Sequence, residues 1–226
     1  MDSHLYLERL YPFQDKVLGV LAPLGTGFYL TGGTCLSRAY LGHRFSDDLD
    51  FFVNHRPEFG LWRDQAIHAL AADARWSCEV LSREERFARL ILRDGETALR
   101  IEWVNDVPCR IGTPREHPAL GRIDSPENIL SNKVTALVDR EEPKDLVDIW
   151  GLCTTLGLSL SRAVSDAAGK AAGVFPPDVA RRLASATEED WKLVKWIAPP
   201  DPARFLSDLQ SLAEQLLSET ASREGG

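Results

Sequence analysis

Two aspartates separated by one residue are the residues of this chain whose spacing most clearly suggests chemistry. Asp48 and Asp50 flank Leu49 and lead into the apolar run Phe51-Phe52-Val53. If this segment is a β-strand, both carboxylates project from one face, with attachment points roughly 6–7 Å apart. Two carboxylates at that spacing can bind one or two hard divalent cations. The competing interpretation is an acidic turn whose side chains cap local amides.

A double glycine precedes these acids. Gly32 and Gly33 follow the apolar stretch 28–30 and precede a helix-like run at 35–40. Glycine amides at the start of a helix can approach a phosphate closely, because no side chain intervenes. Together with the aspartates, the segment indicates a site for a metal and a nucleotide.

Glu102 is the residue we expect as a third acid. It lies in the alternating segment Leu99-Arg100-Ile101-Glu102-Trp103-Val104, on the face opposite the apolar residues. Three acids on neighbouring strands fit phosphoryl or nucleotidyl transfer, in which two magnesium ions bridge a triphosphate. The alternative is an exposed strand residue that pairs with Arg100 or Arg89.

A mixed sheet with interleaved helices must position these residues, so the predicted fold class is α+β. The predicted strands cover residues 28–30, 48–53, 77–81, 87–93 and 98–104. Asp94-Gly95 predicts a hairpin between the last two strands. Helices are predicted at residues 34–41 and 57–72, with one or two short helices within 5–22.

The second half of the chain reads as helical. Ser125-Pro126-Glu127 is a typical helix start, with a hydroxyl cap, a proline and an early acid. The predicted helices cover residues 126–139, 144–156, 160–172, 177–184 and 202–217. We therefore expect an α/β domain over residues 1–120, a helical domain over 121–217 and a disordered tail over 218–226.

Charged residues in this helical half have two interpretations. Lys133 and Arg140 are two turns apart on one helix face, where they either line a groove or are merely solvated. Asp145 and Asp148 also share a face, and Asp145 is alternatively a favourable charge at a helix N-terminus.

Composition limits the class of protein. The chain has 226 residues, 44% of them hydrophobic, and a net charge of −8 that argues against non-specific coating of nucleic acid. It lacks an apolar run near the roughly 20 residues that span a bilayer. With no secretory pattern at its start, we expect a cytoplasmic protein without membrane contact. The four scattered cysteines are expected to be reduced and mostly buried.

Several motifs in this order resemble the nucleotidyltransferase family of AbiEii/AbiGii abortive-infection toxins. The resemblance covers roughly residues 25 to 155. It rests on Gly32-Gly33-Thr34, Arg44-Phe45-Ser46-Asp47-Asp48-Leu49-Asp50-Phe51, Lys133 with Ala136, Leu137 and Arg140, and Lys144-Asp145-Leu146-Val147-Asp148-Ile149. It implies a polymerase-β-like minimal nucleotidyltransferase fold: a small mixed sheet with flanking helices, then a helical region that completes the active-site cleft.

The resemblance also implies roles for individual residues. The metal ligands would be Asp48, Asp50 and Glu102, and Lys133 would reach the phosphates as a catalytic residue. The nucleotide-binding residues would be Gly32, Gly33, Thr34, Arg44, Ser46 and Asp148. Gly33 stands where a serine is common, and Lys144 stands where an arginine is common and cannot make the same forked contacts.

The function predicted in this way is magnesium-dependent transfer of a nucleoside monophosphate from an NTP to an acceptor. The resemblance indicates the toxin of a toxin–antitoxin or phage-defence system, with a cognate antitoxin. The acceptor in such families is RNA, notably a tRNA 3′ end, or a protein. A local basic rim for RNA would comprise Arg38, Arg44, Lys133, Arg140 and Lys144. The alternatives are an inactive nucleotide-binding regulatory module and an aminoglycoside-type small-molecule nucleotidyltransferase.

Overall fold

A computed structural model describes residues 3–224, and its internal contacts divide the chain into two compact units. The first unit comprises the chain up to Tyr40, Phe45–Pro108 and Thr113–Asp124. The second comprises Leu41–Arg44, Cys109–Gly112 and everything from Ser125 onward. The predicted domain boundary near residue 120 stays a prediction, and the longest stretch of the second unit starts at Ser125.

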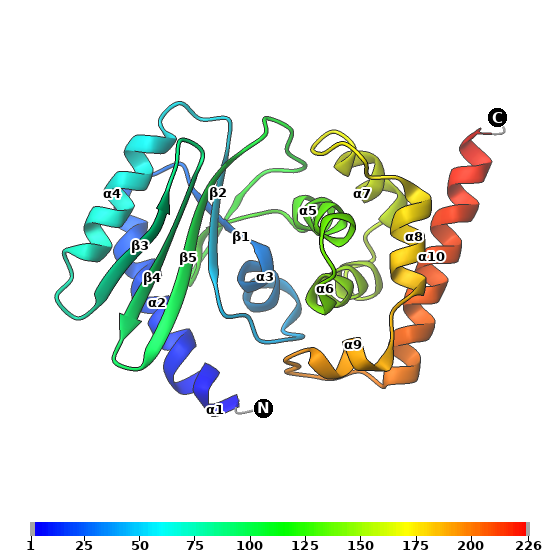
Figure 1. Cartoon of the computed structure of the whole chain (residues 1–226), viewed down its shortest axis with the longest axis horizontal. Coiled ribbons are helices and arrows are strands. Elements are labelled where there is room, and N and C mark those ends of the chain that lie inside the picture. Colours follow the sequence, from blue (N-terminus) through cyan, green and yellow to red (C-terminus); the bar gives the residue numbers. More distant parts are fainter. Residues whose placement is uncertain (1–2, 225–226) are drawn as a thin grey trace. The chain divides into compact units, whose positions relative to one another are not determined.

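The first unit contains a seven-stranded sheet within the described residues, in the order β3-β4-β5-β2-β1-β7-β6 (Figure 1). Its strands are β1 Tyr29–Thr31, β2 Leu49–Asn54, β3 Ser77–Arg83, β4 Phe87–Asp94, β5 Thr97–Asp106, β6 Arg115–His117 and β7 Gly121–Ile123. The pairs β1–β7 and β2–β5 are parallel and the others antiparallel. The predicted mixed α+β fold class is therefore confirmed.

The sequence prediction found β1 to β5 and missed β6 and β7. The two missed strands have three residues each, and Ile123 is the one residue in them that is buried. A strand this short shows no apolar alternation, so the hydrophobic pattern carries no signal for it.

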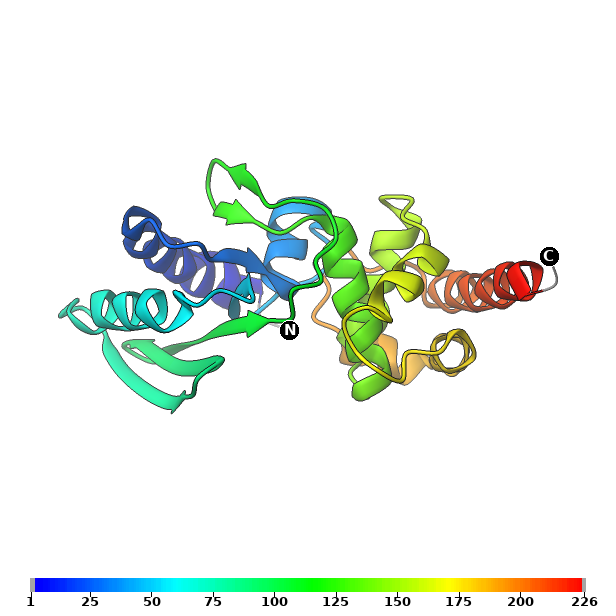
Figure 2. The ribbon, with the colours of Figure 1, turned by 90° about the horizontal axis from the view of Figure 1, so that it is seen from above.

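Side chains alternate across β2, β4 and β5, and one side of the sheet is almost completely buried. The buried residues are Leu49, Phe51, Val53, Ala88, Leu90, Leu92, Leu99, Ile101 and Trp103. Helices α2, Tyr11–Leu21, and α4, Phe59–Ala71, cover this side (Figures 1 and 2). The opposite side carries the polar residues and is called the acid face below.

Helical segments complete the first unit at the predicted places. The N-terminal part runs as α1, Ser3–Leu5, a π-helical segment, Tyr6–Leu10, and α2. A 3-10 turn, Ala22–Leu24, follows α2. After β1, α3 covers Gly32–Cys35 and continues as a π-helical segment, Leu36–Leu41.

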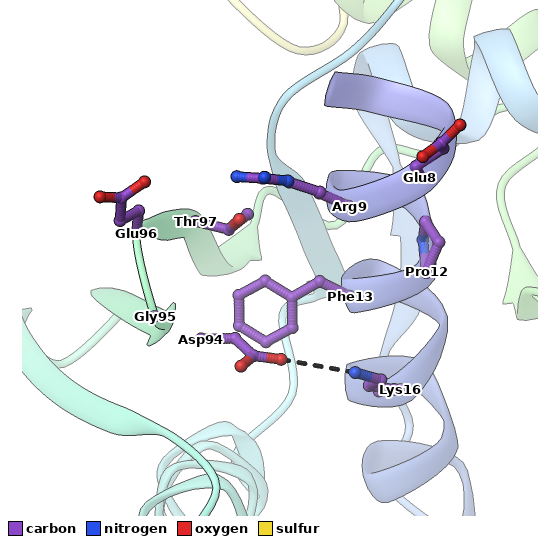
Figure 3. A pocket seen from close by; sticks show the side chains of 9 residues that line it. All are labelled: Glu8, Arg9, Pro12, Phe13, Lys16, Asp94, Gly95, Glu96 and Thr97. Carbon is purple, nitrogen blue, oxygen red and sulfur yellow. Dashed lines mark hydrogen bonds and ion pairs between the residues drawn. The ribbon is translucent and has the colours of Figure 1, made fainter. Parts of the chain in front are cut away.

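The predicted hairpin joins β4 to β5. Asp94 pairs with Thr97, so Gly95 and Glu96 form a two-residue turn, in which Gly95 has a φ of 59°. Figure 3 shows this turn opposite α2, with Lys16 Nζ 3.4 Å from the Asp94 carboxylate across a hollow of about 340 Å³. None of the predicted site residues lines this hollow.

The second unit is helical. Its helices are α5 Pro126–Asp139, α6 Pro143–Thr154, α7 Leu160–Ala167, α8 Pro176–Ala184, α9 Glu188–Leu193 and α10 Pro202–Glu224. All were predicted except α9. The Ser125 hydroxyl accepts a hydrogen bond from the Asn128 amide at 3.3 Å, which confirms the predicted cap. Residues 218–224 of the predicted disordered tail are helical instead, because α10 runs through them, and residues 225–226 lie outside the described part.

Two further expectations concern cysteines and membranes. All four cysteines are free thiols, but only Cys35 and Cys153 are buried, whereas Cys78 and Cys109 are partly exposed. Between residues 3 and 224, no helix combines the length and the apolar character needed to cross a bilayer.

Candidate functional site

The acid face brings the three predicted acids onto one side of the sheet. In the parallel pairing of β2 with β5, Asp50 lies opposite Glu102. On its other flank, Asp50 lies opposite Thr31 of β1. Asp48 precedes β2 by one residue and, being two residues from Asp50, shares its side of the sheet.

The double-glycine turn is packed directly against one of these acids. Gly32 has a φ of 67°, in the left-handed region that glycine adopts without strain. A Cβ atom at this position would collide with the Asp50 carboxylate. The turn and the acid therefore fit together only if residue 32 is glycine.

Two further predicted residues fix the loop that leads to the acids. Thr34 is completely buried, and its hydroxyl donates a hydrogen bond to the carbonyl of Asp48. Ser46 is also buried, and its amide donates to the Tyr11 hydroxyl at 3.3 Å. The Ser46 carbonyl accepts from Gln14 Nε2 at 3.3 Å. These contacts hold the backbone before Asp48.

Two arginines lie beside the acids. Arg89 Nε donates to Glu102 Oε1 at 2.8 Å, so the predicted alternative of an Arg89–Glu102 pair is present in the structure. Arg100 forms an ion pair with Asp48, and its Nε lies 3.5 Å from Glu102 Oε1. The Arg100–Asp48 pair was not predicted, although the alternation of β5 puts Arg100 and Glu102 on one face and was the available signal.

The acid face carries the type of ligand that a divalent cation prefers, but its acids are not gathered into a metal site. Carboxylate oxygens are the ligands that hard cations prefer. Within residues 3–224, no three His, Cys, Asp or Glu side chains are gathered closely enough to hold a metal ion. Instead the guanidinium of Arg100 lies against Asp48 as a stand-in cation. The carboxylates thus already bind positive charge on this face.

Asp124 is a residue of the first unit that the sequence prediction missed. It is completely buried and accepts a hydrogen bond from the Thr31 hydroxyl at 2.7 Å, directly before the glycine turn. Its carbonyl accepts from the Tyr40 hydroxyl. Thr31 and Asp124 are 93 residues apart, so no local pattern signals the contact.

In the second unit, Asp148 is at the centre of a group of buried charges. Its carboxylate accepts two hydrogen bonds from Arg44, from Nε and Nη2, each at 2.7 Å. His43 Nε2 lies 2.9 Å away and Lys133 Nζ 2.7 Å away. Two parallel bonds from one guanidinium give a geometrically specific pair.

Lys133 links this carboxylate to a second one. Its Nζ donates to Asp145 Oδ1 at 2.8 Å, and Arg140 Nε donates to Asp145 Oδ2 at 2.8 Å. We call these residues the buried ion network: His43, Arg44, Lys133, Arg140, Asp145 and Asp148. The two carboxylates are fully buried, and the Lys133 side chain is 9% exposed.

This network corrects two expectations. Lys133 is not solvated, because it is buried between two carboxylates. Arg44 is buried as well, so Arg44 and Lys133 do not belong to an exposed basic rim. Of the other predicted rim residues, Arg38 pairs with Asp15 at 2.5 Å and Lys144 with Glu142 at 2.7 Å.

Proton affinities follow from these contacts. Burial alone would raise the pKa of Asp148, but Arg44, Lys133 and His43 outweigh it and hold that pKa well below its ordinary value. Burial likewise acts to raise the pKa of Asp145, and Lys133 and Arg140 lower it. Burial would lower the pKa of Lys133, but the two aspartates raise it. All three groups are therefore held in their charged forms.

A family model identifies the family of this chain. The model of "Nucleotidyl transferase AbiEii toxin, Type IV TA system" matches residues 17–216. The chain belongs to the AbiEii nucleotidyltransferase toxin family. The predicted family and the predicted enzyme class, nucleotidyl transfer, are thereby confirmed.

One relative in sequence and two solved structures are similar to this chain. The chain is 29% identical over 157 residues to the uncharacterized protein aq_aa25 of Aquifex aeolicus (strain VF5), covering 68% of this chain and 72% of that protein. MenT4, a nucleotidyltransferase toxin of Mycobacterium tuberculosis H37Rv, has a similar fold, with a TM-score of 0.65, 18% identity, and coverage of 92% of this chain and 82% of that one. JHP933 of Helicobacter pylori gives a TM-score of 0.64 at 18% identity over 96% of each chain.

Proposed function

We propose that this AbiEii-family toxin transfers a nucleoside monophosphate from an NTP to an acceptor in a magnesium-dependent reaction that releases pyrophosphate. One observation carries the proposal: Asp50 lies beside Glu102 in the β2–β5 register while Gly32 packs against the Asp50 carboxylate. An acid pair next to a glycine turn is the arrangement expected for a metal and a triphosphate.

The residues of the first unit take the following roles in this proposal. Asp48, Asp50 and Glu102 hold magnesium, with two ions as the expected number. Bound there, magnesium supplies charge neutralisation for the triphosphate and for the oxygens that attack and leave. The amides of Gly32 and Gly33 bind phosphate oxygens. Thr34 bonds the Asp48 carbonyl, and Tyr11 and Gln14 bond the backbone of Ser46, so the loop before the acids is held in position.

The charged residues of the second unit are held in fixed orientations. The resemblance assigns Lys133 to the phosphates, and Asp145 and Asp148 hold its buried ammonium group in one orientation. Arg44 is held in the same way by its two bonds to Asp148.

The test is transfer of label from α-labelled NTPs in the presence of magnesium and cell extract. We expect a labelled product from the wild type and none from Asp48→Ala plus Asp50→Ala. Asp94→Ala is the matched control, since Asp94 is an acid of the same sheet that lies in the β4–β5 turn. Absence of product from the wild type, or equal labelling by the double variant, contradicts the proposal. Digestion of the product with nuclease or protease then identifies the acceptor as RNA, such as a tRNA 3′ end, or as protein.

The arginine pairs on the acid face favour one alternative, a nucleotide-binding module that has lost transfer. In that case NTP and magnesium raise the melting temperature, but no pyrophosphate is released. The aminoglycoside-type alternative predicts turnover with a purified aminocyclitol and none with RNA. As a member of a toxin family, the chain is also expected to have a cognate antitoxin.

A further inference from the structure

The register of β5 places Arg100 on the acid face. It is two residues before Glu102 on β5, and both side chains therefore project to the same side of the sheet. In the parallel pairing Leu49 lies opposite Ile101, so the residues before them, Asp48 and Arg100, are also neighbours. The arginine is thus directed at Asp48 by the backbone.

The contacts of Arg100 are those of a cation that serves two acids. Its Nη2 binds Asp48 Oδ2, and its Nε lies 3.5 Å from Glu102 Oε1. The second distance is too long for a strong hydrogen bond. Glu102 has a shorter bond of 2.8 Å to Arg89. Of the two acids, Asp48 therefore has the closer contact with Arg100.

Arg100 and a divalent cation compete for the same carboxylate. A magnesium ion binds carboxylate oxygen at about 2.0–2.1 Å, and a guanidinium on that carboxylate places a second positive charge close to the ion. For the ion to bind, Arg100 must leave Asp48. Its side chain is 41% exposed and has several rotatable bonds, so it can move while β5 stays in place.

We propose that Arg100 is a displaceable internal cation that occupies Asp48 in the nucleotide-free protein and moves to the triphosphate when the nucleotide and the metal bind. This proposal rests on the function proposed above. The triphosphate is the partner that compensates Arg100 for the loss of Asp48, since guanidinium groups bind phosphate oxygens well. Nucleotide and metal then strengthen one another's binding, and by linkage the effect is equal in both directions.

The test is direct binding of Mn²⁺, measured by electron paramagnetic resonance of the free ion, with and without a non-hydrolysable NTP analogue. Without nucleotide, Arg100→Ala should bind Mn²⁺ about fivefold more tightly than the wild type, the effect of removing one half-exposed ion pair. The analogue should tighten Mn²⁺ binding in the wild type more than in Arg100→Ala. Arg93→Ala, which removes an exposed arginine further along the same face of β4, should behave as the wild type.

Two outcomes separate this proposal from the proposed function. If Arg100→Ala binds Mn²⁺ no more tightly than the wild type, while Asp48→Asn plus Asp50→Asn abolishes binding, the role of Arg100 is wrong and the metal site stands. If the double variant binds Mn²⁺ as well as the wild type, or if no variant binds it at all, both are wrong. Circular dichroism of every variant shows that each is folded.

Discussion

The acid face of the first unit and the buried ion network of the second use the same chemical groups in two different ways. On the acid face, Asp48 and Glu102 are paired with arginines that are each 41% exposed. In the network, Asp145 and Asp148 are fully buried. Exposed pairs exchange partners at small cost, whereas breaking a buried pair leaves an uncompensated charge. Burial therefore separates acids that can change partner from acids that fix their neighbours.

The largest effect we expect comes from removing a charge from the buried ion network. Asp148→Asn removes the charge that compensates Arg44 and Lys133, and we expect a loss of about 3–5 kcal/mol in the free energy of unfolding. Asp48→Asn removes a half-exposed pair and should cost about 1 kcal/mol or less. Urea unfolding of both variants is the measurement. Equal losses would show that the two regions do not differ in this way.

The next largest effect concerns the glycine turn. Gly32→Ala combines an unfavourable left-handed backbone with a collision against Asp50, and we expect about 2–3 kcal/mol of destabilisation. Gly25→Ala is the matched control. Gly25 has a φ of 63° but nothing within 4 Å of an added Cβ, so it should lose about 1 kcal/mol. Thermal unfolding separates the two costs, and an equal loss in both variants would remove the case for contact with Asp50.

The smallest effect we expect is in the acid dependence of stability. Because the pKa of Asp148 is lowered in the folded protein, its contribution is present above the unfolded value of about 4 and disappears as the pH falls toward the lower folded value. Asp148→Asn should therefore show a shallower loss of stability below about pH 4 than the wild type. Urea midpoints measured across this range are the readout. If the stability of the variant falls with pH as steeply as that of the wild type, groups other than Asp148 cause the acid sensitivity.

The same contrast explains how much the sequence predicted. The β2 and β5 acids were placed correctly because alternation along a strand is a local pattern, and the Asp48–Asp50 spacing carries it. Helix α9 was missed although Thr187 and Asp190 form a capping box, because its six residues include none that is buried. A short helix without buried residues has no periodic apolar pattern by which it could be predicted.

Ion pairs between residues far apart in the chain could not be predicted from the sequence, and the reason is physical. Arg44 and Asp148 are 104 residues apart, and their pairing depends on the packing of a whole unit. The pattern on α5 allowed Lys133 either a groove or solvent, and neither interpretation included a partner such as Asp145. Charged side chains have no periodicity that reveals their partners, so burial of a charge becomes visible only in the fold.

The most direct test of the account is the rate of nucleotide transfer by Asp50→Asn. This substitution removes one negative charge, preserves the size of the side chain and leaves the Arg100–Asp48 pair in place. The account predicts a loss of transfer of about a hundredfold or more, since a metal ligand supports several kcal/mol of charge stabilisation. It also predicts a melting temperature close to that of the wild type. A transfer rate within tenfold of the wild type would contradict the claim that the acid face performs the chemistry.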